Sequence, residues 1–177
     1  TVIEEGGSPL ANVDIFISEA NETTITDSRG SYSIDLLPGE YTVILSHQQY
    51  QTVTKYLVKI NSNKDTVLNA ELKPKPGALA GNVIDDKNRA IDNVRVTLIG
   101  TNYFNITDTS GYFYIDGIKP GSYNVSFTHE LYKESSAIVN INKAEETRLN
   151  NFKLSPKTGT LQGYVIDQNT KTPINGA

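Results

Sequence analysis

The sequence predicts an all-β protein that consists of tandem β-sandwiches, and three observations support this prediction. Apolar and polar residues alternate with a period of two in nearly every segment, which is typical of half-buried strands. Turn signals recur at intervals of about 8–12 residues, as expected for a sandwich. The chain also repeats itself, because Gly30 in "TDSRG" and Gly111 in "TDTSG" occupy equivalent places 81 residues apart.

The repeat defines the domain organisation. Residues 25–50 match residues 106–132, and "KPGALAGNVIDD" at 75–86 matches "KTGTLQGYVIDQ" at 157–168. The period of about 81 residues predicts three parts. They are a first sandwich over 1–74 whose first strand is truncated, a complete second sandwich over 75–156, and, over 157–177, either the first strand and turn of a third sandwich or a donor strand.

The complete second repeat shows the expected strands in order. Its first strand alternates through Leu79 and Val83, and the next strand places Val94, Val96 and Leu98 on one face. Further alternating segments lie at 111–116, 122–129, 135–142 and 146–154. The segment 142–149 has the most helical pattern of the chain, and it is equally compatible with a turn that enters the last strand.

The turns between these strands have chemical reasons. Asp27 and Asp108, in the "TDSRG" and "TDTSG" turns, can accept hydrogen bonds from backbone N–H groups two residues on, and the glycine can adopt a positive φ. In "LPGEY" and "IKPGSY" a proline fixes φ near about −65° and a glycine follows, which reverses the chain between two strands.

These motifs together resemble the carboxypeptidase regulatory-like domains, which have a transthyretin-like (prealbumin-like) β-sandwich fold. The matching residues are Gly81, Val83 and Asp85 of the first strand, "TPINGA" at 172–177, Thr26, Asp27, Gly30, Tyr32 and Ile34 of the next element, and Leu37, Pro38, Gly39, Tyr41 and Val43 of the following hairpin. The family's corner glycine is replaced by Gln49 and by Leu131. The resemblance implies seven-stranded, Ig-like sandwiches that serve as accessory modules beside peptidases, in outer-membrane receptors or in tandem on cell surfaces.

Composition and charge argue against several classes of function. The net charge of −4 and the pI of about 5.2 do not fit a nucleic-acid-binding surface. No apolar run reaches the roughly 18 residues of a membrane span, so we expect no membrane insertion within this segment. The chain has no cysteine and no G-x-S-x-G motif, and two copies of one active site would be unusual. We therefore expect neither catalysis nor a cofactor.

Several polar residues have both a structural and a functional interpretation. His47 and His129 are repeat equivalents, and without a second histidine at ligand spacing they fit strand ends better than metal sites. Loop carboxylates are either turn formers or calcium ligands. They are Asp27, Asp85, Asp86, Asp108 and Asp167. A Lys–Asn isopeptide bond would need Lys87 beside Asn69, Asn150 or Asn151.

Three N-x-[S/T] sequences mark candidate N-glycosylation sites, at Asn21, Asn105 and Asn124. Two tyrosines are candidates for a contact surface. Tyr112 and Tyr114 flank an inward-facing phenylalanine, so they form either an aromatic surface for a glycan or a neighbouring domain, or ordinary exposed strand positions.

The functional hypothesis is a non-enzymatic structural protein: a semi-rigid extracellular or cell-surface stalk, surface-layer component or fibre subunit. Short proline-containing linkers favour a stiff rod over a flexible chain. The expected partners are copies of the chain itself or adjacent repeats of the same chain, with surface glycans as a further option. The alternative hypothesis is a carbohydrate- or protein-binding accessory module of a larger secreted protein or hydrolase.

Head-to-tail strand complementation is a sharper form of the first hypothesis. A truncated first strand exposes a sheet edge, which a strand from another chain can fill. The tail offers a donor strand with the right alternation, through Thr160, Leu161, Gly163, Val165 and Asp167. The competing interpretation is that this tail belongs to a longer continuous array.

Overall fold

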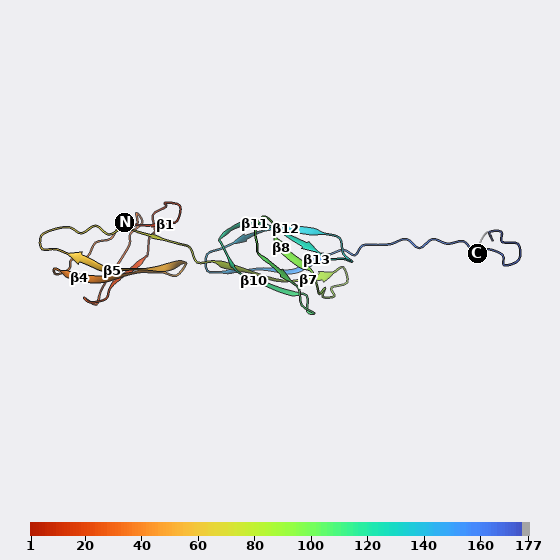
Figure 1. Ribbon diagram of the computed structural model, residues 1–177, viewed down its shortest axis with the longest axis horizontal. Coiled ribbons are helices and arrows are strands. Elements are labelled where there is room, and N and C mark those ends of the chain that lie inside the picture. The colour runs from red at the N-terminus through yellow and green to blue at the C-terminus, as the bar shows by residue number, and fades with distance from the viewer. Residues whose placement is uncertain (175–177) are drawn as a thin grey trace.

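The computed structural model describes residues 1–174 and shows two β-sandwiches arranged end to end, followed by an extended C-terminal tail (Figure 1). Residues 1–174 consist of strands and turns, so this part of the chain offers no apolar helix of membrane-spanning length. The predicted all-β class and the tandem arrangement are confirmed.

The second sandwich has seven strands in two sheets. They are β7 (Gly77–Asp85), β8 (Arg95–Leu98), β9 (Phe104–Ile106), β10 (Tyr112–Ile118), β11 (Gly121–Thr128), β12 (Ser135–Ile141) and β13 (Glu146–Leu154). One sheet has the order β10-β7-β13, in which β7 is antiparallel to β10 and parallel to β13. The other has the order β12-β11-β8-β9 and is antiparallel throughout. The segment with the most helical pattern forms a turn that leads into β13.

Alternation along the strands builds the core of the second sandwich. Val96 and Leu98 of β8 are fully buried, as the pattern predicts. Phe127 of β11 is also fully buried, and its ring stacks on that of Phe152 in β13 with centroids 3.9 Å apart. Phe113 of β10 packs edge-on against Phe127 at 6.0 Å. These aromatic contacts join the two sheets, because β11 belongs to one sheet and β10 and β13 to the other.

The first sandwich repeats this plan with six strands. They are β1 (Val2–Glu4), β2 (Asp14–Ile17), β3 (Glu22–Ile25), β4 (Gly39–His47), β5 (Tyr50–Ile60) and β6 (Ala70–Leu72). The parallel pair β1-β6 corresponds to β7-β13, and the sheet β3-β2-β4-β5 corresponds to β9-β8-β11-β12. The predicted repeat therefore holds at the level of sheet topology.

The segment 31–36 is the sequence counterpart of β10, but it is not a strand. Its residues Tyr32, Ile34 and Leu36 still pack against the core, as their alternation predicts. In the second sandwich β10 gains its strand partner from β7, which has nine residues, whereas the corresponding β1 has three. Within residues 1–174 the segment therefore has the inward face of a strand but no paired strand beside it.

In each sandwich a buried threonine hydroxyl at the equivalent position forms hydrogen bonds with two backbone groups of a neighbouring loop. Thr26 donates to the C=O of Leu10 at 2.7 Å and accepts from the N–H of Val13 at 2.9 Å. Thr107 makes the equivalent two bonds in the second sandwich, at 2.8 and 2.9 Å. The threonine of the repeated "TD" motif therefore satisfies two buried backbone groups of a neighbouring loop.

The tail stands apart from both sandwiches (Figure 1). Residues 157–165 form no strand pairing within the described chain, and the side chain of Leu161 is 99% exposed. A hairpin follows, in which the N–H of Ile174 donates to the C=O of Val165 at 2.9 Å. Residues 175–177, the end of the predicted "TPINGA" turn, lie outside the described residues.

Candidate interdomain and assembly sites

Lys75, in the linker between the sandwiches, is hydrogen-bonded to both of them. Its N–H donates to the C=O of Gln49 at 2.9 Å, and its own C=O accepts from the N–H of Ala144 at 3.4 Å. Its ammonium group donates to the C=O of Gln48 at 2.9 Å. The linker is therefore part of the folded structure at this point and does not act as a free hinge.

Three side chains join the two sandwiches beside this linker, and we call them the interdomain clamp. Glu4, at the end of β1, accepts a hydrogen bond from the Tyr50 hydroxyl at 2.6 Å. Glu4 also binds the ammonium group of Lys143, in the turn between β12 and β13, at 2.6 Å. Lys143 in turn bonds to the Tyr50 hydroxyl and lies 4.5 Å from the centroid of the Tyr50 ring. The contacts that Lys143 makes with Glu4 and Tyr50 link the second sandwich to the first, whereas the bond between Tyr50 and Glu4 lies within the first.

The sequence carried no recognisable signal for this clamp. Glu4 and Lys143 are 139 positions apart, and the first-sandwich equivalent of Lys143 is Ser62, so the repeat does not mark the position. The equivalent of Glu4 is Asp85, which binds Arg89 of its own hairpin at 2.7 Å. The clamp is therefore a property of this junction and not of the repeat.

The clamp predicts that the junction loosens in acid. The hydrogen bond from Lys143, and after it the one from Tyr50, lowers the pKa of Glu4 below its usual value of 4.5. A carboxylate with a lowered folded-state pKa stabilises the contact above its unfolded pKa, and this contribution is lost as pH falls through the folded value. We expect an intact junction at pH 7 that loosens only below pH 4.5, measured by residual dipolar couplings of the two sandwiches.

Glu4→Gln supplies the control for this pH dependence, because the amide does not titrate. The variant should have a weaker junction at pH 7 and no further clamp transition in acid. An acid transition of the same size in the variant would show that other carboxylates cause the loosening.

In each sandwich a histidine stabilises the turn of one hairpin, the turn between β4 and β5 in the first and the turn between β11 and β12 in the second. The Nδ1 atom of His47 accepts from the N–H of Gln49 at 3.1 Å, and its ring packs edge-on against Tyr50 with centroids 5.1 Å apart. His129 makes the equivalent two contacts in the second sandwich, at 3.0 and 5.1 Å. The imidazole thus caps the turn in which the family pattern has a glycine, which supports the structural interpretation of both histidines.

Four of the five loop carboxylates cap turns, whereas Asp86 accepts a hydrogen bond from the Ser155 hydroxyl at 3.4 Å. Asp27 accepts from the N–H groups of Arg29 and Ser31, both at 2.8 Å. The bond from Ser31, and then that from Arg29, lowers the pKa of Asp27. Backbone N–H groups also donate to Asp85, Asp108 and Asp167. Residues 1–174 contain no group of three side chains that could hold a metal ion.

The candidate glycosylation sites lie on different parts of the sandwiches. Asn21 is exposed in the turn before β3, and Asn124 is exposed on β11. Asn105 is half-buried on β9. Glycosylation of these three residues stays a prediction.

Two of the candidate isopeptide asparagines have other hydrogen-bond partners. The side chain of Asn151 accepts from the Asn82 amide at 3.0 Å, and that of Asn69 accepts from the N-terminal amine at 2.6 Å. Lys87 lies in the hairpin turn that Asp85 caps. These contacts hold both amides in place without a lysine.

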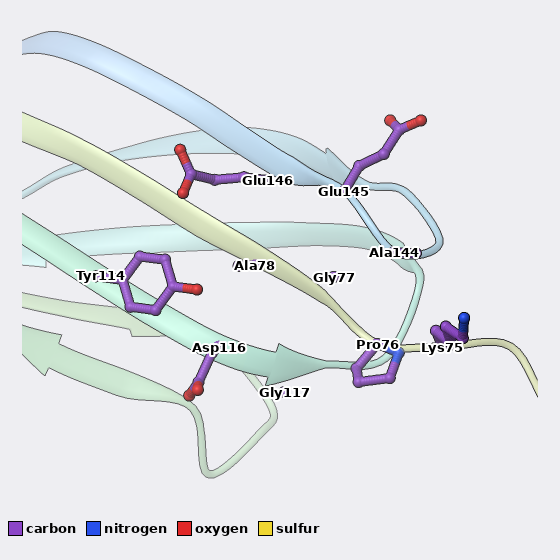
Figure 2. A pocket seen from close by; sticks show the side chains of 10 residues that line it. All are labelled: Lys75, Pro76, Gly77, Ala78, Tyr114, Asp116, Gly117, Ala144, Glu145 and Glu146. Carbon is purple, nitrogen blue, oxygen red and sulfur yellow. The ribbon is translucent and has the colours of Figure 1, made fainter. Parts of the chain in front are cut away.

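A groove of about 560 Å³ lies at the end of the second sandwich next to the linker (Figure 2). The start of β7 runs between Tyr114 and Asp116 of β10 on one side and Glu146 of β13 on the other. Gly77 and Ala78 carry little or no side chain, which leaves the groove open. Its rim is mainly acidic and also includes one lysine and one aromatic ring.

Tyr112 and Tyr114 are each 42% exposed, as their outward position on β10 predicts. Their equivalents in the first sandwich are Ser31 and Ser33. The aromatic pair is therefore present in one sandwich only and is not a repeated surface.

The first sandwich contains a second groove, of about 500 Å³, between segments 31–36 and 64–68. The residues that line it include Tyr32, Ile34, Val43, Val58 and Leu68. The residues of the predicted donor strand lie in the tail at the other end of the molecule, away from this groove of the same chain (Figure 1). They are Thr160, Leu161, Gly163, Val165 and Asp167.

The two sheets per unit, the repeated corners and the ordered linker define a class of protein: tandem Ig-like, prealbumin-like β-sandwich domains. The chain belongs to the carboxypeptidase regulatory-like domain family, which matches residues 1–73 and again residues 78–155. The resemblance seen in the sequence motifs is thereby confirmed for both sandwiches.

Individual relatives cover this chain to different extents. Over 75 residues it is 35% identical to the TonB-dependent receptor P39 of Formosa agariphila, a match that spans 41% of this chain and 7% of the receptor. The Bacillus anthracis TIE protein superposes with a TM-score of 0.51 at 17% identity, over 88% of this chain and 33% of that one. A minor pilin of Streptococcus agalactiae gives a TM-score of 0.40 at 14% identity, over 89% and 88% of the two chains. The likeness to the TIE protein shows a shared fold.

Proposed function

We propose that this chain is a non-enzymatic, semi-rigid segment of an extracellular or cell-surface protein, in which tandem sandwiches form a stalk, surface layer or fibre. The junction carries the proposal. Lys75 is hydrogen-bonded to both sandwiches, and the interdomain clamp closes beside it. Two sandwiches held in this way keep a fixed mutual orientation, which is the property a spacer needs.

The exit from the second sandwich supports the same function. The N–H of Lys157 donates to the C=O of Leu131 at 2.8 Å, and its ammonium group donates to the C=O of Glu130 at 2.8 Å. Lys75 makes the equivalent bonds at the first exit. Each sandwich thus fixes the direction in which the chain leaves it, so that further repeats would lengthen the rod without a flexible joint.

The surface location is supported by the family and by the similarity to part of a TonB-dependent receptor. Antibody or protease access to this segment on intact cells that express the full-length gene product tests it. Access only after lysis would contradict an exposed stalk.

The semi-rigid rod predicts that the two sandwiches tumble as one body, measured by ¹⁵N relaxation. Lys143→Met removes the contacts of this ammonium group with Glu4 and Tyr50 and should weaken the junction by about 1 kcal/mol, the scale of a partly exposed ion pair. In this variant the rotational correlation times of the two sandwiches should differ more than they do in the unmodified chain. Lys153→Met, on an exposed position of β13, is the matched control and should tumble as the unmodified chain does. Independent tumbling in the unmodified chain would contradict the proposal.

A second candidate function is an accessory module that binds carbohydrate or protein. Tyr112 and Tyr114 favour it, because they are partly exposed and Tyr114 lines the groove beside the linker. Aromatic rings on an open strand face are a common platform for sugar rings and protein partners. Chemical-shift changes confined to these two tyrosines during a glycan titration would favour the binding module, and unchanged spectra would favour the stalk.

A further inference from the structure

Strand β12 lies at the edge of its sheet in the second sandwich. The sheet has the order β12-β11-β8-β9, so among residues 1–174 β12 pairs with β11 alone. An edge strand presents unpaired backbone groups that another strand can bind, and proteins block such pairing with short strands, charged side chains, prolines or bulges. We call an edge closed when it has one of these features and open when it has none.

The other three edges of the second sandwich are closed. β9 has only three residues. β10 and β13 each contain a shift of register and charged side chains. The charged residues are Asp116 of β10 and Glu146, Arg148 and Lys153 of β13. β12 differs from all three, because its seven residues pair with β11 in continuous register and include neither a charged residue nor a proline.

The equivalent edge of the first sandwich, β5, is also closed. Lys55 lies opposite the buried Val43, so a lysine starts from the inward face of this edge, where the second sandwich has Ala137. The register of β5 shifts beside this lysine, and Leu57 has a positive φ of 56°. An inward lysine and a bulge both prevent a further strand from pairing. β12 lacks both features at the same place in the repeat.

Backbone hydrogen bonds show which residues of β12 face β11. The N–H of Ile99, just after β8, donates to the C=O of Asn124 in β11 at 2.9 Å. Successive residues of a strand direct their backbone groups to opposite sides, so the next residue, Val125, directs its groups toward β12. Val125 pairs with Ala137. Ala137 and its alternate neighbours therefore bond to β11, and the residues between them direct N–H and C=O to the free edge.

Three residues of β12 direct their backbone groups to the free edge: Ser136, Ile138 and Asn140. The hydroxyl of Thr147 donates to the C=O of Asn140 at 3.0 Å, so this C=O accepts a bond from outside the ladder with β11. The side chains of the same three residues are exposed, and Ile138 is 78% exposed. The edge thus offers one isoleucine between two small polar side chains.

We infer that β12 of one copy pairs antiparallel with β12 of a second copy about a two-fold axis at Ile138. This register places Ile138 opposite Ile138 of the second copy and Ser136 opposite Asn140 of the second copy. All three residues with outward backbone groups then lie in hydrogen-bonded pairs. Isoleucine covers isoleucine, a hydroxyl meets an amide, and no charge in the strand repels its copy. The contact is self-complementary, as a two-fold interface requires.

This contact lies on the side of the second sandwich. The strands there run along the length of the molecule (Figure 1), so the pairing places two copies side by side and pointing in opposite directions. It uses neither the linker nor the interdomain clamp, so it goes beyond the proposed stalk and does not depend on it. The relaxation experiment tests the junction and the experiment below tests the edge, and one can fail while the other holds.

Cysteine trapping at the axis tests the pairing, because the chain has no cysteine of its own. Opposite residues of a hydrogen-bonded pair have Cα atoms about 5.5 Å apart, within the range that a disulfide bridges. On oxidation with copper–phenanthroline, Ile138→Cys should form a cross-linked dimer several-fold faster than the matched control Tyr56→Cys, which is 73% exposed on the closed edge. Equal rates would overturn the inference. So would a mixed dimer of the two variants that forms as fast as the Ile138→Cys dimer, because it would assign β12 to β5 of another copy.

Two charge variants of the Ile138→Cys chain test the register. Ser136→Lys with Asn140→Lys places like charges directly opposite each other on both sides of the axis, and cross-linking should fall several-fold. Ser136→Lys with Asn140→Glu places opposite charges at the same points and should restore it. Both positions are exposed, and thermal unfolding curves that match the parent show that the variants are folded. Equal cross-linking in the two charge variants would contradict this register and overturn the inference.

Discussion

Gly81→Ala should unfold the second sandwich or lower its free energy of unfolding by more than about 3 kcal/mol, the upper range for overpacking a core. The new Cβ would meet the carbonyl oxygen of Leu149 at 2.1 Å. β7 is the central strand of its sheet and is paired on both sides, so it cannot move away from β13 without breaking its pairing with β10. Calorimetry should show loss or a large downward shift of one transition, while that of the first sandwich, which has a separate core, is kept.

Gly163→Ala is the matched control, because Gly163 holds the same place in the repeat but lies in the tail. Nothing lies within 4 Å of its Cβ position, so the variant should melt as the unmodified chain does. If Gly81→Ala were as stable as Gly163→Ala, the close approach of β7 and β13 would be wrong.

Phe127→Ala should destabilise the second sandwich by about 3–5 kcal/mol, the cost of truncating a buried phenylalanine. Its ring is fully buried, stacks on Phe152 at 3.9 Å and meets Phe113 edge-on at 6.0 Å. Truncation therefore leaves a cavity where the two sheets meet and removes two aromatic contacts. Urea denaturation followed by near-ultraviolet circular dichroism measures the loss.

The same substitution at an exposed phenylalanine shows whether the loss of stability comes from the burial of the ring or from the change of residue type alone. Phe104 is 49% exposed, and the guanidinium carbon of Arg95 lies 4.0 Å from its ring centroid. Phe104→Ala should cost less than about 1 kcal/mol, the scale of an exposed cation–π contact. Equal losses in the two variants would argue against a core centred on Phe127.

Alternation predicted which residues face the core, and this part of the fold follows from the sequence. Val96, Leu98 and Phe127 are all fully buried, as their positions in the pattern require. Alternation does not show, however, which strands lie next to each other in a sheet. Tyr32 and Ile34 have the right pattern and the right face, yet the segment 31–36 is not a strand, because strand formation depends on a partner that the pattern does not encode.

The interdomain clamp could not be predicted for a related reason. Its residues come from positions that are distant along the chain and not equivalent in the repeat, and Tyr50 carried only the signal of a corner residue. The corner histidines are different, because a histidine three residues before a tyrosine occurs in both repeats. The recurrence can be seen in the sequence, but the role of the histidine cannot. The ring nitrogen accepts a hydrogen bond from the N–H of the corner residue, and this contact depends on the three-dimensional arrangement of the turn.

The ion pair between Asp85 and Arg89 has a mechanical consequence. Asp85 stands where the first sandwich has Glu4, and its carboxylate is already engaged within its own hairpin. In an array that continues past the second sandwich, the next joint would lack the acidic anchor of the first. A sideways force would then bend the array at that joint first, so a single change of side chain would set the order in which the joints yield.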